Sequence, residues 1–96
     1  MIRTPFPLLA LALAAAPAAA LTEEETRGYA AILPMLEEVS PQDGDVLAAC
    51  VVSTAEPAEK ATLAAASGPS EELGALVSAI LARPATIGCV QATLGG

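Results

Sequence analysis

The sequence predicts an all-α protein, a small bundle of four to five short helices joined by one disulfide after a cleaved signal peptide. Three features predict this class: apolar residues recur at helical spacing, the chain is rich in alanine with 2% aromatic residues, and it holds two cysteines. Without residues 1–20, 76 of the 96 residues remain. That length suffices for one domain, and a core this small commonly needs a covalent link or a partner.

Residues 1–20 have the organisation of an export signal. Arg3 supplies the positive start, Leu8–Ala16 the apolar stretch, and Ala18–Ala20 the small residues of a cleavage site. The apolar stretch is shorter than a membrane span and an acidic segment follows at once, so a retained membrane anchor is the weaker interpretation. We therefore expect a periplasmic or secreted protein with a single helical domain at 21–96.

The first helix is expected to start after Thr22, with Glu25 completing a capping box. Pro34 lies inside its apolar face and predicts a kink or a break near Ile32–Pro34, because proline donates no amide hydrogen bond. The apolar face consists of Tyr29, Ile32, Leu33, Leu36 and Val39.

The second helix is expected from Ser40 as cap and Pro41 as first helical residue to about Ala55. Its apolar stripe consists of Val46, Leu47, Cys50, Val51 and Thr54. A third, short helix is expected from Pro57 to Ala66, with Leu63 as its one large core residue. Its spacing also favours a surface ion pair between Glu56 and Lys60.

The fourth helix has the clearest pattern, with Ser70 as cap, Glu71 and Glu72 in the first turn, and Arg83 at its end. Its apolar stripe consists of Leu73, Leu76, Val77, Ile80 and Leu81. Because this stripe is the longest without interruption, we expect the helix at the centre of the bundle, with Leu76 and Ile80 as central core residues.

A fifth, short helix is expected from Pro84, with Ile87, Val90 and Leu94 accompanying Cys89. A disulfide between Cys50 and Cys89 would then join the second and fifth helices. An oxidising compartment and a small core favour this pairing over a redox pair. A lipidated Cys50 is the weaker interpretation, since the residue lies far beyond the apolar stretch of the signal.

Charge is distributed unevenly along the chain. Eleven acidic residues stand against four basic ones, of which Arg3 lies in the signal, so the formal charge of residues 21–96 is −8. Scattered cations form no basic stripe, which disfavours nucleic acid and anionic membranes as partners.

From residue 61 onward, however, charge is sparse. The low-charge outer face of the fourth helix is the candidate interaction surface, made of Gly74, Ala75, Ser78, Ala79 and Ala82. A plain alanine-rich surface, or a helix covered on both sides, is the alternative.

The sequence offers no catalytic residue, cofactor site or metal site. Histidine is absent, which excludes His-dependent triads and His-ligated metals, and no glycine-rich phosphate loop is present. The carboxylate cluster lacks the spacing of a calcium-binding loop, so a solvated turn is the favoured interpretation. It consists of Glu37, Glu38, Asp43 and Asp45.

We therefore expect a small exported, non-enzymatic interaction or accessory protein that uses its low-charge C-terminal helical surface for a protein partner or for self-association. The general plan, a small helical domain with one disulfide and an acidic face, is similar to that of the small acid-activated periplasmic chaperones. This resemblance implies an acid-responsive periplasmic chaperone as the alternative. A carrier of a small apolar ligand is a further alternative, since alanine-rich helices can wall a cavity.

Overall fold

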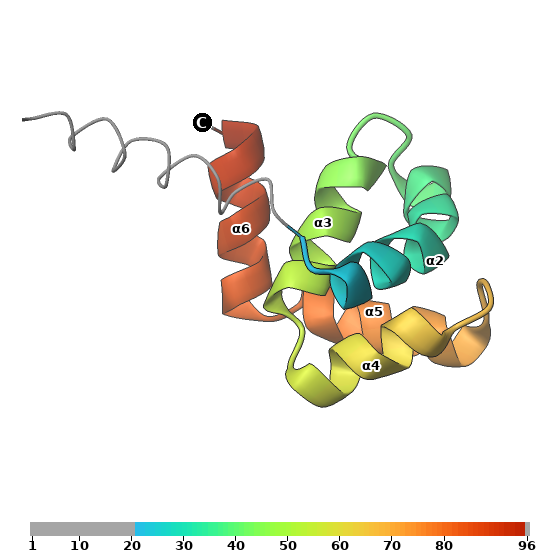
Figure 1. Ribbon diagram of the computed structural model, residues 1–96. Coiled ribbons are helices and arrows are strands. Elements are labelled where there is room, and N and C mark those ends of the chain that lie inside the picture. Colours follow the sequence, from blue (N-terminus) through green and yellow to red (C-terminus); the bar gives the residue numbers. More distant parts are fainter. Residues whose placement is uncertain (1–20, 96) are drawn as a thin grey trace, which may run out of the picture.

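The computed structural model describes residues 21–95, and the predicted signal peptide lies outside them. The described residues form five α-helices and no strand (Figure 1). In chain order these are α2 (Glu23–Val39), α3 (Gly44–Thr54), α4 (Pro57–Ala65), α5 (Glu71–Leu81) and α6 (Pro84–Gly95). The predicted all-α class and the single disulfide are confirmed for this part of the chain.

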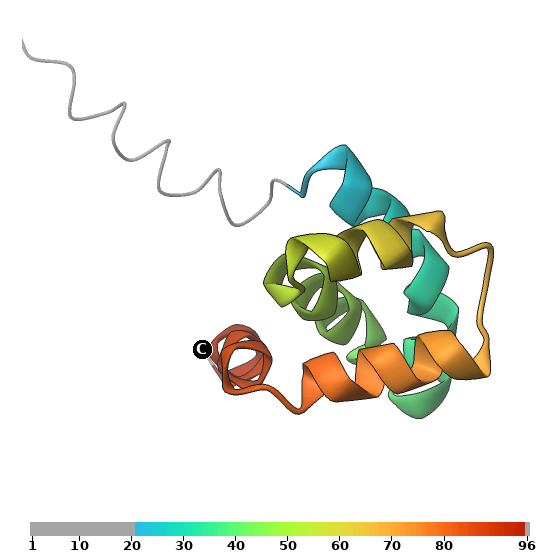
Figure 2. The same ribbon diagram turned by 90° about the horizontal axis from the view of Figure 1, so that it is seen from below.

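Helix α2 is the centre of the bundle. It is the longest helix, with 17 residues, and it packs along both α3 and α4 (Figures 1 and 2). Gly28 permits this, because a Cβ atom there would lie 3.1 Å from Cβ of Leu63 on α4 and 3.3 Å from Cγ1 of Val52 on α3. Helix α5 makes fewer contacts, so the prediction that it is the central helix is wrong. The buried core consists of Ile32, Leu36, Ala48, Val51, Val52, Ala55, Leu63, Leu73, Val77 and Ile80.

Helix α2 begins with the predicted capping box. The hydroxyl of Thr22 accepts a hydrogen bond from the N–H of Glu25 at 3.0 Å, and the Glu25 carboxylate accepts one from the N–H of Thr22 at 3.0 Å. Two amide donors at the helix start are thereby satisfied. The prediction of this helix start is confirmed.

The sequence predicts a kink or a break at Pro34; helix α2 continues through Pro34, so the break is absent. Proline leaves the carbonyl of Ala30 without its usual amide donor, which costs about 3 kcal/mol in a helix interior. Ile32 and Leu36, on either side of the proline, are both buried in the core. Their burial offsets the lost hydrogen bond and holds the two halves in one helix, whose ribbon curves around the core in Figure 2.

Helix α3 begins at Gly44, three residues later than the predicted start at Pro41. The predicted cap, Ser40, instead terminates α2, because its N–H donates to the carbonyl of Leu36 at 2.8 Å. The N–H of Asp43 then donates to the carbonyl of Ser40 at 3.2 Å, which closes the turn between the helices.

The buried faces of α2 and α3 differ in part from the predicted stripes. Val39, the last residue of α2, is 78% exposed, and Val46 and Leu47 of α3 are only partly buried. The buried residues of α3 are Gly44, Ala48, Cys50, Val51 and Val52. Helix α3 is covered on two sides, so residues outside the predicted stripe, Ala48 and Val52, also enter the core.

Helices α4 and α5 begin as predicted. Pro57 is the first residue of α4, and Leu63 is fully buried. The hydroxyl of Ser70 accepts a hydrogen bond from the N–H of Leu73 at 3.1 Å and so caps α5.

Helix α5 contacts the core through a narrow face. Leu73, Val77 and Ile80 are buried, whereas Leu76 and Leu81 are partly buried on its flanks. The prediction of Ile80 as a central core residue is confirmed, and that of Leu76 is wrong. The reason is that α5 packs only lightly on α2 and α3, which leaves one flank of its apolar stripe uncovered.

Helix α6 stands at the edge of the molecule, where it packs mainly on α3 (Figures 1 and 2). Thr86 is its one fully buried residue. Val90 is partly buried, Ile87 is 42% exposed and Leu94 is 49% exposed. Ile87 and Leu94, which were predicted to accompany Cys89, thus lie outside the core, because no other helix among residues 21–95 covers the outer side of α6.

Candidate functional site

The Cys50–Cys89 disulfide fastens α6 to α3. The two residues are 39 positions apart in sequence and their Cα atoms are 5.8 Å apart, so the predicted pairing is confirmed. Cys50 is buried and Cys89 is partly buried. Closing a loop of this length stabilises a fold by about 4 kcal/mol through the entropy of the unfolded chain. The pairing is consistent with an oxidising compartment outside the cytoplasm.

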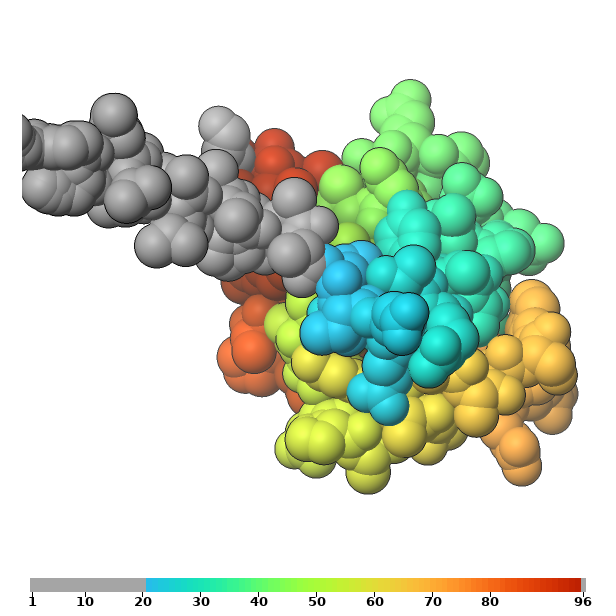
Figure 3. Space-filling view, in the orientation of Figure 1, coloured from blue at the N-terminus to red at the C-terminus, as the bar shows by residue number. Residues whose placement is uncertain are grey.

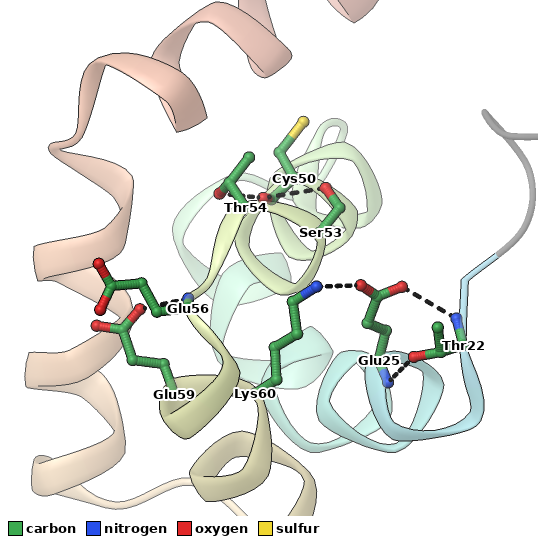
Figure 4. Close-up of polar contacts among 8 residues, drawn as sticks. All are labelled: Thr22, Glu25, Cys50, Ser53, Thr54, Glu56, Glu59 and Lys60. Carbon is green, nitrogen blue, oxygen red and sulfur yellow. Dashed lines mark hydrogen bonds and ion pairs between the residues drawn. The ribbon is translucent and has the colours of Figure 1, made fainter.

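A pair of threonines supports the disulfide. The hydroxyl of Thr54 donates to the carbonyl of Cys50 at 2.6 Å, and its oxygen lies 2.7 Å from the hydroxyl oxygen of Thr86 (Figure 4 shows Thr54 and Cys50). Because Thr54 uses its one proton on Cys50, Thr86 is the donor between the hydroxyls. Sequence reasoning missed Thr86. Its spacing from Cys89, one helical turn, is the signal that could have identified it.

The outer face of α6 carries the exposed apolar surface of the C-terminal half. No charged residue lies between Pro84 and Gly95. Successive residues of an α-helix are turned by about 100° around its axis. On the side of α6 opposite Thr86 and Cys89 lie Gly88, Gln91 and Gly95. Ile87 and Leu94 stand beside them, and all five residues are exposed. We call Ile87, Gly88, Gln91, Leu94 and Gly95 the α6 outer face.

The predicted interaction surface on α5 lies on the outside of the bundle. Ala75, Ser78, Ala79 and Ala82 are exposed, and Gly74 is partly buried. No helix among the described residues covers this face, which removes the alternative of a helix covered on both sides within the chain. Large apolar side chains are absent from it, whereas the α6 outer face provides two.

The helix glycines fall into two groups. At Gly28 a Cβ atom would make a tight contact with Leu63, at 3.1 Å, and at Gly44 it would collide with the backbone of Glu37, at 2.9 Å. At Gly74 and Gly88 no neighbour among the described residues lies within 4 Å of such an atom. Glycine inside a helix costs about 1 kcal/mol relative to alanine. Packing within the chain accounts for that cost in the first group and not in the second.

Two ion pairs hold α4 against its neighbours. Lys60 Nζ lies 2.5 Å from Glu25 Oε2 at the start of α2, and Figure 3 shows this part of α2 directly against α4. Arg83, beside α6, donates two hydrogen bonds to the carboxylate of Glu59, at 2.7 and 2.5 Å. The predicted pair of Glu56 with Lys60 is therefore wrong. The packing of α4 on α2 brings Lys60 to Glu25 instead (Figure 4).

Both carboxylates have lowered pKa values. The hydrogen bond from Lys60 is the main cause of the lowered pKa of Glu25, and the N–H of Thr22 adds to it against the opposing effect of burial. The hydrogen bonds from Arg83, followed by the N–H of Glu56, lower the pKa of Glu59 from 4.5 to about 2. Both lowered pKa values mean that the two carboxylates stay charged, and keep α4 in place, to lower pH than an ordinary glutamate.

Two surface hollows flank the Ala66–Pro69 loop between α4 and α5. One, of about 640 Å³, is lined by this loop with residues of α4 and α5 such as Thr62 and Leu73. The other, of about 480 Å³, lies against α2 at Arg27 and Pro34. Both lie at the surface and not between the core helices, so neither supplies the enclosed apolar cavity that a ligand carrier needs.

The acidic turn between α2 and α3 is part of the packing of these helices. Glu37 of this cluster contacts Gly44, and the N–H of Asp43 lies in the turn. Among residues 21–95, no three His, Cys, Asp or Glu side chains are arranged to hold a metal ion.

Within residues 21–95 no single helix is long and apolar enough to cross a membrane. Helices α5 and α6 together reach the required length and composition, with a bend of 77° between them. No family model matches the chain, and neither a curated protein nor a solved structure matches it.

Proposed function

We propose that this chain is a small exported, non-enzymatic interaction protein, periplasmic or secreted, whose contact surface is the low-charge outside of α5 and α6. The observation that carries the proposal is the state of α6. This helix is fixed covalently by Cys89, yet it buries one residue fully and leaves Ile87 and Leu94 exposed. A helix that adds little to the core but is held rigidly is suited to presenting a surface.

The local charge supports a protein partner. Two of the three basic residues at 21–96, Lys60 and Arg83, are paired with carboxylates of the chain. The surface of α6 is uncharged, so binding there depends on apolar area and shape and not on neutralising phosphates or lipid head groups.

Site-specific photo-crosslinking in the cells that export the protein tests the proposal. A photoreactive residue in place of Ile87 should yield a crosslinked adduct. The same residue in place of Thr62, which is exposed on α4, serves as the matched control and should yield little. Absence of an adduct from position 87, or equal adducts from both positions, would contradict the proposed contact surface.

A second candidate function, an acid-responsive chaperone, is favoured by the two ion pairs of α4. Protonation of Glu25 and Glu59 in strong acid removes both links, and Leu63 of α4 lies at the centre of the core. Loosening of α4 would then expose apolar surface for clients.

Aggregation of an unrelated envelope protein near pH 2 to 3, with and without this chain, tests the second candidate. A chaperone should suppress aggregation there, and the double variant E25Q/E59Q should do so at higher pH because it lacks both acidic partners. No protection at equimolar or higher ratios eliminates this function.

A further inference from the structure

The α6 outer face repeats one arrangement at an interval of seven residues. Ile87 is followed by Gly88, and Leu94 is followed by Gly95, so a large apolar side chain stands beside a glycine twice, two helical turns apart. Gln91 lies midway between the two glycines on the same face.

This arrangement is complementary to itself. When two copies of α6 lie antiparallel with a two-fold axis at Gln91, each flank of the outer face meets the same flank of the second copy. Leu94 then lies beside Ile87 of the second copy on one flank, and Gly88 lies beside Gly95 of the second copy on the other flank. The large side chains can pack together, while the glycines allow the two backbones to approach closely.

The central residue also fits a two-fold contact. At the symmetry axis each Gln91 meets its own mate, and the side-chain amide carries both a donor and an acceptor. Two glutamines can therefore hydrogen-bond to each other, which fixes the register of the pair. Two-fold symmetric dimers of this kind, with the same surface on both copies, are the commonest form of oligomer.

Two further observations favour a second copy as the occupant. Within residues 21–95, nothing lies within 4 Å of a Cβ atom placed at Gly88 or Gly95, so packing among these residues does not require either glycine. The chain is strongly acidic, with a formal charge of −7, but α6 is uncharged and brings no like charges together across the axis. A second acidic copy can therefore approach along α6 without bringing like charges together.

We propose that two copies of the protein associate through antiparallel contact of their α6 outer faces, with the crossing point at Gln91. The inference rests on the proposed function, in that it names the partner of the same surface. One short helix from each copy buries less than the ~1,200 Å² of stable complexes, so the dissociation constant is expected on the order of 0.1 mM. Screening of the acidic charges by salt should tighten the dimer.

Sedimentation equilibrium of the purified protein tests the proposal, over concentrations from roughly 10 μM to roughly 1 mM, to bracket the expected constant. The wild type should reach the dimer. Gly88→Gln should weaken it more than tenfold, because the new side chain blocks the close approach of Gly95 from the second copy. Ala61→Gln is the matched control, since it adds the same side chain to exposed α4 and should leave the dimer intact.

A second pair of variants tests the crossing point. Gln91→Glu places two carboxylates at the axis and should weaken the dimer at neutral pH. Thr62→Glu adds the same charge to exposed α4 and should have a much smaller effect. Both sites are exposed, and circular dichroism establishes that each variant folds.

A wild type that stays monomeric throughout overturns the proposal, as does a Gly88→Gln variant that dimerises like the wild type. Flotation of the monomer with phosphatidylcholine vesicles would likewise overturn it and assign the α6 outer face to lipid. If the wild type is monomeric but position 87 crosslinks to a different protein in cells, self-association fails and the proposed interaction function stands. If position 87 yields no adduct in cells, the proposed function fails as well.

Discussion

Glu59 on α4 accepts two hydrogen bonds from Arg83, and this charged contact makes the stability of the fold depend on pH. The pKa of Glu59 is lowered to about 2 in the folded protein, from 4.5. A lowered pKa means that the carboxylate stabilises the fold fully above the unfolded value. That stabilisation is lost as the pH falls from 4.5 toward about 2. Glu25, whose pKa is also lowered, acts in the same direction.

We therefore predict that Glu59→Gln makes the free energy of unfolding less dependent on pH between 4.5 and about 2. Urea unfolding at several pH values measures this slope. Glu38→Gln, an exposed carboxylate outside both ion pairs, is the control. Parallel slopes for Glu59→Gln and the wild type would show that the contact with Arg83 does not stabilise the fold.

The two groups of glycines predict opposite effects of alanine. Gly44→Ala places a Cβ atom 2.9 Å from the backbone of Glu37, and such overpacking should destabilise the fold by about 1–3 kcal/mol. Gly74→Ala meets no neighbour and should stabilise by about 0.5–1 kcal/mol through helix propensity. Thermal unfolding of the two variants, at concentrations where the protein is monomeric, measures both effects. Equal effects would mean that Gly44 is not needed for the approach of α3 to α2.

At the scale of the helices, Leu76 and Ile80 of α5 differ in burial, although the sequence predicts both as central core residues. Ile80→Ala should cost about 2–5 kcal/mol, because Ile80 is fully buried. Leu76→Ala should cost clearly less, since this side chain is partly exposed. Urea unfolding midpoints of the two variants test the difference. A larger loss for Leu76→Ala would place the core on the other flank of α5.

Helix α6 depends on its disulfide more than on apolar burial. Replacing both Cys50 and Cys89 by alanine should lower stability by about 3–4 kcal/mol. Amide protons of α6 should then exchange with solvent before those of α2 and α3, because Thr86 is the one fully buried residue of α6. Hydrogen exchange measures this order. Uniform loss of protection would instead make α6 an integral part of the core.

Local chemistry determined which helix features could be predicted. The Thr22 and Ser70 caps and the Pro57 start depend on neighbouring residues and are found as expected. The break at Pro34 is absent because burial of Ile32 and Leu36 offsets the missing hydrogen bond, and periodicity does not measure that balance. Likewise, the apolar residues of α6 follow helical spacing, but spacing does not reveal whether another helix covers them.

The candidate surface was predictable in composition but not in location. Sparse charge after residue 61 predicted an interaction surface on the small residues of α5, and these residues are mostly exposed. The larger apolar side chains, Ile87 and Leu94, were predicted to accompany Cys89, and they are exposed. Their exposure follows from the packing of α6 mainly on α3, which depends on contacts between residues far apart in the sequence.

At the scale of the whole molecule, charge and apolar exposure are segregated. The ion pairs link α4 to Glu25 of α2 and to Arg83 just before α6, while α6 itself is uncharged and packs mainly on α3 at the edge of the molecule (Figure 1). Acidic repulsion keeps copies apart over most of the surface and leaves α6 as the place of contact. The central claim of this account is that contacts form on the α6 outer face.

Amide chemical shifts of the ¹⁵N-labelled protein, recorded from dilute to concentrated solution, test that claim most directly. The account predicts concentration-dependent shifts at Ile87, Gly88, Gln91 and Leu94, with little change on α2 and α4. The same titration with Gly88→Gln should show no such shifts. Spectra of the wild type that do not change with concentration, or changes centred on α2 and α4, would contradict the claim.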